Sequence, residues 1–243
     1  PESYYEFQKA VIQTEEEIKN GATVIYEAAF QFEGVLAAID ILVKDESGWK
    51  AYEVKSSTSV NNTYRMDGSL QYYVIKNSGI DLIDFYIVYI NNQYIKNGEI
   101  DVHELFAIES IHDDIKQNLP GLPNQVNRLK TVLKQDEIPT KDIGPHCNEP
   151  YGCEFEGYCW KHIPEYSVFD IGNLRSNKKF ELYNMGAIEL NQIPKDYEMG
   201  EKQWLQVDCE LEHKSHINKE EITNYLNDLK YPLYYFDVET IGP

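Results

Sequence analysis

The chain has 243 residues, of which 41 are acidic and 22 basic, so its formal net charge is −19. A hydrophobic content of 42% indicates a folded chain and excludes a disordered or collagen-like one. The acidity argues against a protein that coats DNA through Lys and Arg, but it permits a nucleic-acid enzyme whose bound metal ions add positive charge. No apolar run reaches the roughly 18 residues that cross a bilayer, and we expect a cytoplasmic protein without a signal peptide or membrane partner.

The first predicted elements are a helix and a meander of strands. Ser3 and Glu6 fit a capping box ahead of apolar residues at helical spacing, which predicts a helix that ends at Asn20-Gly21. Period-two patterns then predict three antiparallel strands, joined by one tight turn and one polar turn. These strands are Val24–Phe32, Val35–Val43 and Trp49–Ser56.

Helices and strands alternate in the next part of the chain. The predicted elements are a helix over 67–77, strands over 82–91 and 102–106, and helices over 110–135 with a break at 119–123. A loop rich in Pro, Gly and Cys follows, and short helices and connectors occupy the rest to about residue 230. A meander followed by alternating strands and helices predicts a mixed α/β domain.

Three acidic residues fall on neighbouring strands of the predicted meander. A turn centred on residues 46–47 pairs Asp40 with Glu53, and a turn centred on residues 33–34 pairs Glu27 with Asp40. This register places the three carboxylates in one row, with each pair about 5 Å apart at Cβ.

Carboxylates that adjoin on one sheet face repel each other unless a cation lies between them. Mg²⁺ and Mn²⁺ prefer hard oxygen ligands, so Asp40 and Glu53 are candidate metal ligands, with Glu27 as a third. Lys55 shares a face with Glu53 and would orient a metal-bound water or stabilise a phosphate in transfer. The alternative is a solvated sheet face with scattered charges. The offset of Lys55 and the apolar flanks of both strands favour the metal site.

Asp40, a hairpin, Glu53-x-Lys55 and then Gln71-Tyr72-Tyr73 on the next helix resemble the PD-(D/E)XK nuclease superfamily. The resemblance is to the RecB-like branch related to the CRISPR-associated iron–sulphur exonucleases, over roughly residues 20–165. It implies a restriction-endonuclease-like mixed sheet flanked by helices, and a metal-dependent nuclease acting on single-stranded DNA or duplex ends. It also implies that Gln71 contacts the substrate backbone or the nucleophile, and that DNA-repair or defence proteins are partners.

The chain departs from the family pattern in three ways. Ile39 stands where a Pro is expected before the Asp, and Ile75 stands where a Tyr is expected four residues after Gln71. Family members also carry a His or Glu on a helix upstream of the strands, and no His precedes Asp40. Either Glu27 or a residue upstream of this chain therefore completes the predicted metal site.

Three cysteines lie close together in the Gly- and Pro-containing loop, a setting that suits a tetrahedral metal or an iron–sulphur cluster. They are Cys147, Cys153 and Cys159. The resemblance implies a [4Fe-4S] cluster whose fourth Cys precedes the nuclease core, but no Cys occurs before residue 147. We expect the fourth Cys to lie upstream of this chain, in preference to recruitment of Cys209, which is in a predicted strand or connector. Zn²⁺ completed by His146 and His162 is a second alternative, and loss of the cluster is the third.

The last apolar segment, Tyr234–Thr240, is predicted to be a strand with Asp237 and Glu239 on one face. It resembles the first motif of DnaQ-like 3′–5′ exonucleases, whose Asp and Glu bind catalytic metals. We expect this chain to be the front part of a fusion, cut at both ends, so that these two acids form no active site here. The alternative is a chance edge strand.

The sequence thus predicts that the chain has four parts. The predicted function is that of a metal-dependent deoxyribonuclease, and the family resemblance implies an exonuclease. The four parts are a RecB-like core (1–145), a Cys-rich metal motif (146–163), a helical connector (164–230) and the first strand of a DnaQ-like domain (231–243). Two other functions stay open: a non-catalytic DNA-binding or scaffold module, and an iron–sulphur sensor domain.

Overall fold

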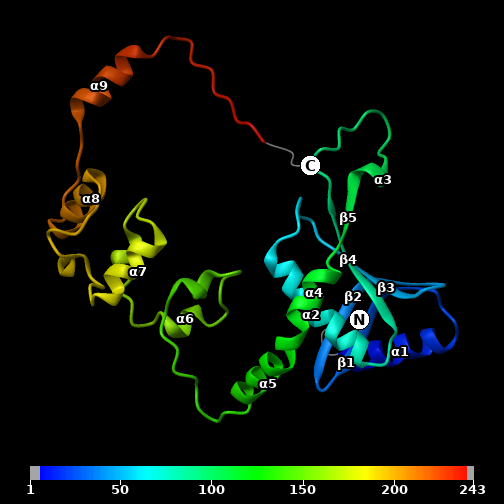
Figure 1. The fold of residues 1–243 in the computed structure, drawn as a ribbon. Helices are drawn as coiled ribbons and strands as arrows, with labels where there is room; N and C mark the ends of the chain where they lie inside the picture. Colours follow the sequence, from blue (N-terminus) through cyan, green and yellow to red (C-terminus); the bar gives the residue numbers. More distant parts are fainter. Residues whose placement is uncertain (1–5, 240–243) are drawn as a thin grey trace. The chain divides into compact units, whose positions relative to one another are not determined.

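The computed structural model describes residues 6–239, which fall into two compact units, one through Glu137 and one from Ile138 (Figure 1). The first unit contains a sheet with helices packed on it. Its elements are α1 Phe7–Lys19, β1 Val24–Phe32, β2 Val35–Asp45, β3 Gly48–Val54, α2 Asn62–Asn77, β4 Leu82–Ile90, α3 Val102–Leu105, β5 Phe106–Ser110, α4 His112–Asn118, the 3-10 turn η2 Leu119–Gly121 and α5 Leu122–Leu133.

The five strands form one mixed sheet in the order β1-β2-β3-β4-β5. Neighbouring strands are antiparallel except β3 and β4, which are parallel and are joined through α2, as a parallel pair requires a crossover. Residue numbers of partners sum to 67 between β1 and β2 and to 93 between β2 and β3, as Val24↔Val43 and Ile41↔Tyr52 illustrate. Both predicted hairpin registers are therefore confirmed, together with the α/β sheet flanked by helices.

The core of the first unit lies between the sheet and α2, which packs against β1, β2 and β4. Ile39 of β2, Phe85 and Ile87 of β4, and Val74 and Ile75 of α2 are fully buried there. Burying apolar area of this kind is the main stabilising term of folding. The core therefore fixes α2, and every side chain on its inner surface, relative to β3.

Helix α1 shields the free edge of the sheet at β1. The Thr14 hydroxyl is buried and accepts a hydrogen bond from the backbone N–H of Ala29, with 3.0 Å between the two heavy atoms. An exposed edge strand invites pairing with other chains, and this contact blocks it.

We expect Thr14→Val to lower the free energy of unfolding by about 1 kcal/mol, because the isosteric change leaves the Ala29 N–H without its acceptor. Urea unfolding followed by circular dichroism measures the change. Thr131→Val is the matched control, since the Thr131 hydroxyl donates only to a carbonyl of its own helix. A Thr14→Val loss no larger than the Thr131→Val loss contradicts the edge-capping role.

Two predicted elements of the first unit are corrected. Helix α2 begins at Asn62 rather than 67, because the Asn61 side chain caps it by accepting from the Tyr64 N–H. The predicted strand over 102–106 is wrong: α3 occupies Val102–Leu105, with Asp101 as its cap, and the strand starts at Phe106. Its partner β4 ends at Ile90, opposite Phe106, so no ladder exists for 102–105. Ser3 of the predicted capping box lies outside the described residues.

The second unit is built from short helices around two small cores. Its elements are η3 Pro145–Asn148, α6 Glu156–Cys159, η4 Val168–Asp170, α7 Ser176–Asn184, η5 Leu190–Gln192, α8 Glu201–Leu211 and α9 Lys219–Asp228. One core includes Val168, Ile171 and Leu182, and the other joins Cys147 to Phe180. The helical C-terminal region is confirmed. None of the helices within residues 6–239 combines the length and apolar character that crossing a membrane requires.

Two expectations for this unit are corrected. Cys209 lies on helix α8, not on a strand or connector, because residues 201–211 form three helical turns with Val207 buried. The described part of the predicted terminal strand, 234–239, is irregular and has no strand partner, and its apolar side chains, including Tyr235 and Phe236, are exposed. Thr240 lies outside the described residues.

Candidate active site

The candidate site begins where the ladder between β2 and β3 ends. The last ladder pair is Ile41↔Tyr52, and the same register continued by one step sets Asp40 opposite Glu53. The Asp40 carboxylate accepts a hydrogen bond from the Val54 N–H, with 2.6 Å between Oδ2 and N. The Asp40 side chain thus holds the end of β3 beside β2, and its carboxylate lies next to β3.

Glu53 is an acidic side chain in a mostly buried position, with 8% of the residue exposed. Its Oε1 accepts a hydrogen bond from Lys55 Nζ at 2.8 Å, while its Oε2 has no partner among the described residues. Burial raises the pKa of Glu53 and the negative charge of Asp40 raises it further, against the opposing effects of Lys55 and of the Gln71 side chain. A cation at Oε2 would relieve both the burial and the repulsion.

Lys55 lies between two carboxylates. Its ammonium nitrogen is 2.8 Å from Glu53 Oε1 and 3.3 Å from Asp67 Oδ2. Burial lowers the pKa of Lys55, but the hydrogen bond and charge of Glu53, with the charge of Asp67, outweigh it and leave the pKa above its ordinary value. The backbone N–H of Lys55 donates to the Val88 carbonyl at 2.8 Å, which extends the pairing of β3 with β4. Lys55 is therefore a fixed, protonated donor.

Gln71 reaches the same place from helix α2. It is 9% exposed, its Nε2 donates to Asp67 Oδ2 at 3.3 Å, and its Oε1 has no partner among residues 6–239. Asp67 and Gln71 are four residues apart and so share one helix face. Sequence reasoning identified Gln71 but missed Asp67, although the spacing on the predicted helix was the available signal.

Glu27 is not brought into this group. The register sets it opposite Asp40, as predicted, because the pairs on either side, Tyr26↔Ile41 and Ala28↔Ile39, both sum to 67. The ladder omits this pair, however, and Glu27 has a left-handed backbone, with φ of 53°. Its exposed side chain instead lines a pocket of about 320 Å³ with Gln13, Thr14 and Glu17. Within the described part of the chain, no set of three or more His, Cys, Asp or Glu side chains is arranged to hold a metal ion. The predicted row of three carboxylates is therefore reduced to the pair Asp40 and Glu53.

A pair of carboxylates still fits a divalent ion of the magnesium type. Mg²⁺ usually takes one or two carboxylates and fills its other positions with water and substrate phosphate oxygens. The Oε2 atom of Glu53, buried and unpartnered, is the kind of donor that such an ion uses. Asp40 and Glu53 would hold the ion at the end of the β2–β3 ladder.

The cysteine loop has a different outcome. Cys147 is buried, Cys153 is exposed and Cys159 is half-buried, and all are free thiols that the structure does not gather into a metal-holding group within residues 6–239. Both ring nitrogens of His162 are occupied, at 3.0 Å each from the Cys159 carbonyl and the Tyr183 hydroxyl. A metal on this loop would therefore need the three thiols to come closer together than they lie here.

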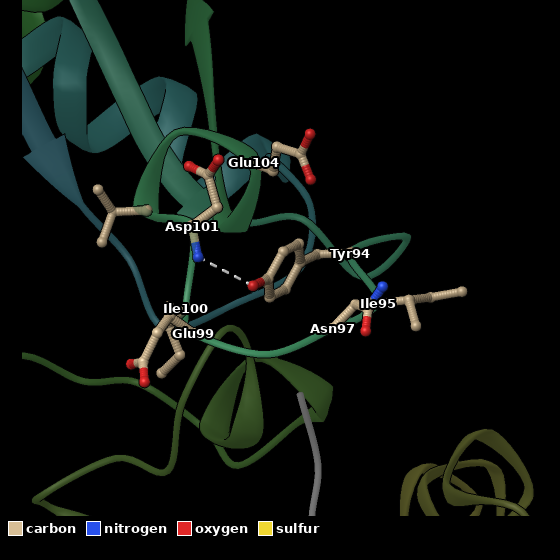
Figure 2. Close-up of a pocket in the computed structure, with 8 residues that line it drawn as sticks. Tyr94, Ile95, Asn97, Glu99, Ile100, Asp101 and Glu104 are labelled. Carbon is tan, nitrogen blue, oxygen red and sulfur yellow. Dashed lines mark hydrogen bonds between the residues drawn. The ribbon is translucent and has the colours of Figure 1, made fainter.

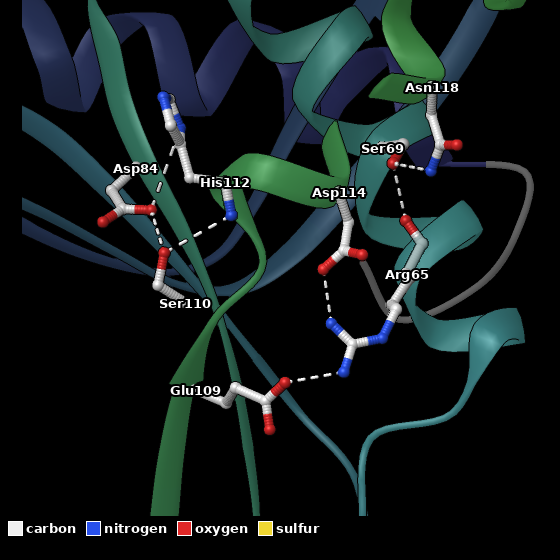
Figure 3. Close-up of polar contacts among 8 residues, drawn as sticks. All are labelled: Arg65, Ser69, Asp84, Glu109, Ser110, His112, Asp114 and Asn118. Atoms are coloured by element: carbon white, nitrogen blue, oxygen red, sulfur yellow. Dashed lines mark hydrogen bonds and ion pairs between the residues drawn. The ribbon is translucent and has the colours of Figure 1, made fainter. Parts of the chain in front are cut away.

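Arg65, on α2, is tied to carboxylates rather than free for phosphate (Figure 3). Its guanidinium donates to Glu109 at 2.7 Å and to Asp114. The carbonyl of Arg65 accepts from Ser69, which in turn accepts from Asn118, so the cluster links α2, β5 and α4. Arg65 therefore stabilises the packing of these elements and does not face a phosphate at the candidate site.

We expect Arg65→Ala to lower the free energy of unfolding by about 1 kcal/mol, because its partly exposed ion pairs are screened by solvent. Its effect on the proposed reaction should be small, since Arg65 contacts none of Asp40, Glu53 and Lys55. Thermal unfolding and a cleavage assay on the same preparation measure both effects. A large loss of cleavage with unchanged stability contradicts this structural role.

A larger pocket of about 520 Å³ lies in the loop after β4 (Figure 2). The Tyr94 hydroxyl accepts a hydrogen bond from the Asp101 N–H there, at 3.0 Å. Its acidic residues are Glu99, Asp101 and Glu104. None of the candidate site residues lines this pocket, so it is separate from the site.

Comparisons with known proteins add little. No protein-family model and no curated protein matches the chain. One similar solved structure is the crystal structure of an alkaline exonuclease (LHK-Exo) from Laribacter hongkongensis, with 12% sequence identity and a TM-score of 0.26. The match covers 53% of this chain and 71% of that chain. A similarity of this size carries no argument about activity, which therefore rests on the site residues.

Proposed function

We propose that the first unit is a divalent-metal-dependent deoxyribonuclease of the RecB-like type, an exonuclease acting on single-stranded DNA or duplex ends. One observation carries the proposal. The buried Glu53 carboxylate has one oxygen on Lys55 and the other unpartnered, with Asp40 next to it in the register. A structural ion pair would satisfy both oxygens, whereas a metal site needs one of them free.

Each of the four residues has a separate role in phosphodiester hydrolysis. Asp40 and Glu53 would hold Mg²⁺ or Mn²⁺, which when bound polarises the phosphate and makes a bound water more acidic. The Lys55 ammonium would donate to the attacking water or to a phosphate oxygen, where negative charge grows in the transition state. The free Oε1 of Gln71 would accept from the attacking water or from the substrate backbone. Glu27 is left out of this ligand set.

The test is a cleavage assay with Mn²⁺ or Mg²⁺ on single-stranded and duplex DNA labelled at either end. We expect Glu53→Gln to abolish cleavage and to weaken Mn²⁺ binding measured by calorimetry, because an amide is a weaker ligand than a carboxylate. Glu46→Gln, in the exposed turn between β2 and β3, should change neither. Equal cleavage by the two variants removes Glu53 from the mechanism, and DNA binding without any metal binding favours a non-catalytic module instead.

A metal on Cys147, Cys153 and Cys159, either a [4Fe-4S] cluster or Zn²⁺, stays a separate prediction. Anaerobic purification, metal analysis and visible absorbance that bleaches on reduction test it. A cluster in a protein without nuclease activity would favour a sensor domain, because the thiol loop and the carboxylate pair share no residue.

A further inference from the structure

We infer that Asp67 is a positioning residue of this site: it orients the amide of Gln71 and the ammonium group of Lys55 toward the substrate. The inference rests on the proposed function. A single atom, Asp67 Oδ2, lies 3.3 Å from both Gln71 Nε2 and Lys55 Nζ. Asp67 is itself outside the metal pair and acts only through these two neighbours.

The first consequence concerns the amide of Gln71. A carboxylate only accepts hydrogen bonds, so Asp67 selects the NH₂ end of the amide and turns the carbonyl oxygen away. The opposite orientation would set Oε1 of Gln71 against Oδ2 of Asp67, acceptor against acceptor. Gln71 is 9% exposed and its Oε1 is unpartnered among the described residues. Asp67 therefore makes Gln71 an acceptor, suited to a water or hydroxyl group that donates a proton.

The second consequence concerns the ammonium of Lys55. An ammonium group has three N–H donors. Glu53 and Asp67 take one each, and the ring of Tyr64, with its centroid 5.3 Å from Nζ, is a further neighbour of the ammonium. Two fixed donors determine the direction of the remaining one. Without Asp67 the ammonium could rotate about its contact with Glu53, and its free donor would no longer have one direction.

A purely structural role for Asp67 is less consistent with its position. Its side chain is 42% exposed, and it stands after the first turn of α2, where a carboxylate no longer favours the helix N-terminus. Its two partners are both residues of the candidate site. Removing Asp67 should therefore change the site more than it changes the fold.

The experiment compares Asp67→Ala and Asp67→Asn with wild type in the Mn²⁺-dependent cleavage assay. Loss of a group that orients a site residue typically costs about 10–100-fold, and we expect Asp67→Ala to lower kcat by that factor with KM and Tm nearly unchanged. Asp67→Asn should recover part of the loss, because its carbonyl still accepts one hydrogen bond. Asp113→Asn, at an exposed position of α4, is the charge-matched control and should behave as wild type.

Two further readouts separate positioning from stability and from the proposed function. In a Gln71→Ala, Lys55→Ala background, Asp67→Ala should have no further effect on any residual cleavage. Independently, the side-chain NH₂ resonances of Gln71 in NMR, assigned by their absence in Gln71→Ala, should shift in Asp67→Ala and not in Asp113→Asn. Unshifted resonances, or full activity of Asp67→Ala, overturn the inference. If wild type cleaves no DNA, the proposed function fails, and the Gln71 resonances alone decide whether Asp67 orients that amide.

Discussion

Lys55→Ala is expected to lower the rate of Mn²⁺-dependent DNA cleavage by about 10²–10⁴-fold, the range found when a single charged or proton-donating group is removed from a reaction centre. Lys55 is a protonated donor held between Glu53 and Asp67, and its burial makes its charge more effective than it would be in water. Removing it also leaves Glu53 buried without its cation. The loss should therefore appear in kcat.

The control for this variant is Lys50→Ala. Lys50 lies on β3, which Lys55 directly follows. The Lys50 side chain is 26% exposed against 21% for Lys55, and it forms its own ion pair, with Asp45. It contacts no candidate site residue, so Lys50→Ala should cleave DNA at nearly the wild-type rate. Single-turnover cleavage with excess enzyme measures the chemical step in both variants. Equal rates for Lys50→Ala and Lys55→Ala would show that Lys55 takes no part in the reaction.

The part of the site on the meander could be predicted because turns determine register. Glu33-Gly34 and the turn near Ser47 set the two pairings, which continue to Asp40 opposite Glu53. A register error of one residue would have moved either side chain to the other face. The two registers were predicted correctly because both turns are short and their residues are distinctive.

Other parts could not be predicted, for reasons that are also physical. Glu27 keeps its predicted place opposite Asp40, but its backbone is left-handed, which alternation does not reveal, and its side chain lines a different pocket. Asp67 acquires its role from Lys55, twelve residues earlier on another element, and only the packing of α2 brings them together. Residues 102–105 were predicted to be part of a strand from their side chains, but the partner strand β4 does not extend to them.

The position of α2 depends on one residue without a side chain, Gly68. A Cβ atom added there would lie 2.5 Å from Ile111 Cδ1 and 2.9 Å from Phe85 Cε1, both fully buried. Alanine normally favours a helix by about 1 kcal/mol over glycine. Inserting a methyl group into a packed core costs about 1–3 kcal/mol and occasionally more. At two such short contacts we expect Gly68→Ala to lower the free energy of unfolding by about 2 kcal/mol overall.

Gly68→Ala should also impair the proposed reaction, because Gly68 directly follows Asp67 and lies one turn before Gln71. Displacing α2 from β4 lengthens the contacts of Asp67 with Lys55, which are already 3.3 Å, so cleavage should fall even where the protein is fully folded. Gly121→Ala is the matched control, since a Cβ there meets nothing within 4 Å. Chemical unfolding and cleavage below the unfolding transition measure the two effects. Wild-type stability of Gly68→Ala would mean that Phe85 and Ile111 repack around the added methyl group. Close packing of α2 against β4 would then not be needed to position the site residues.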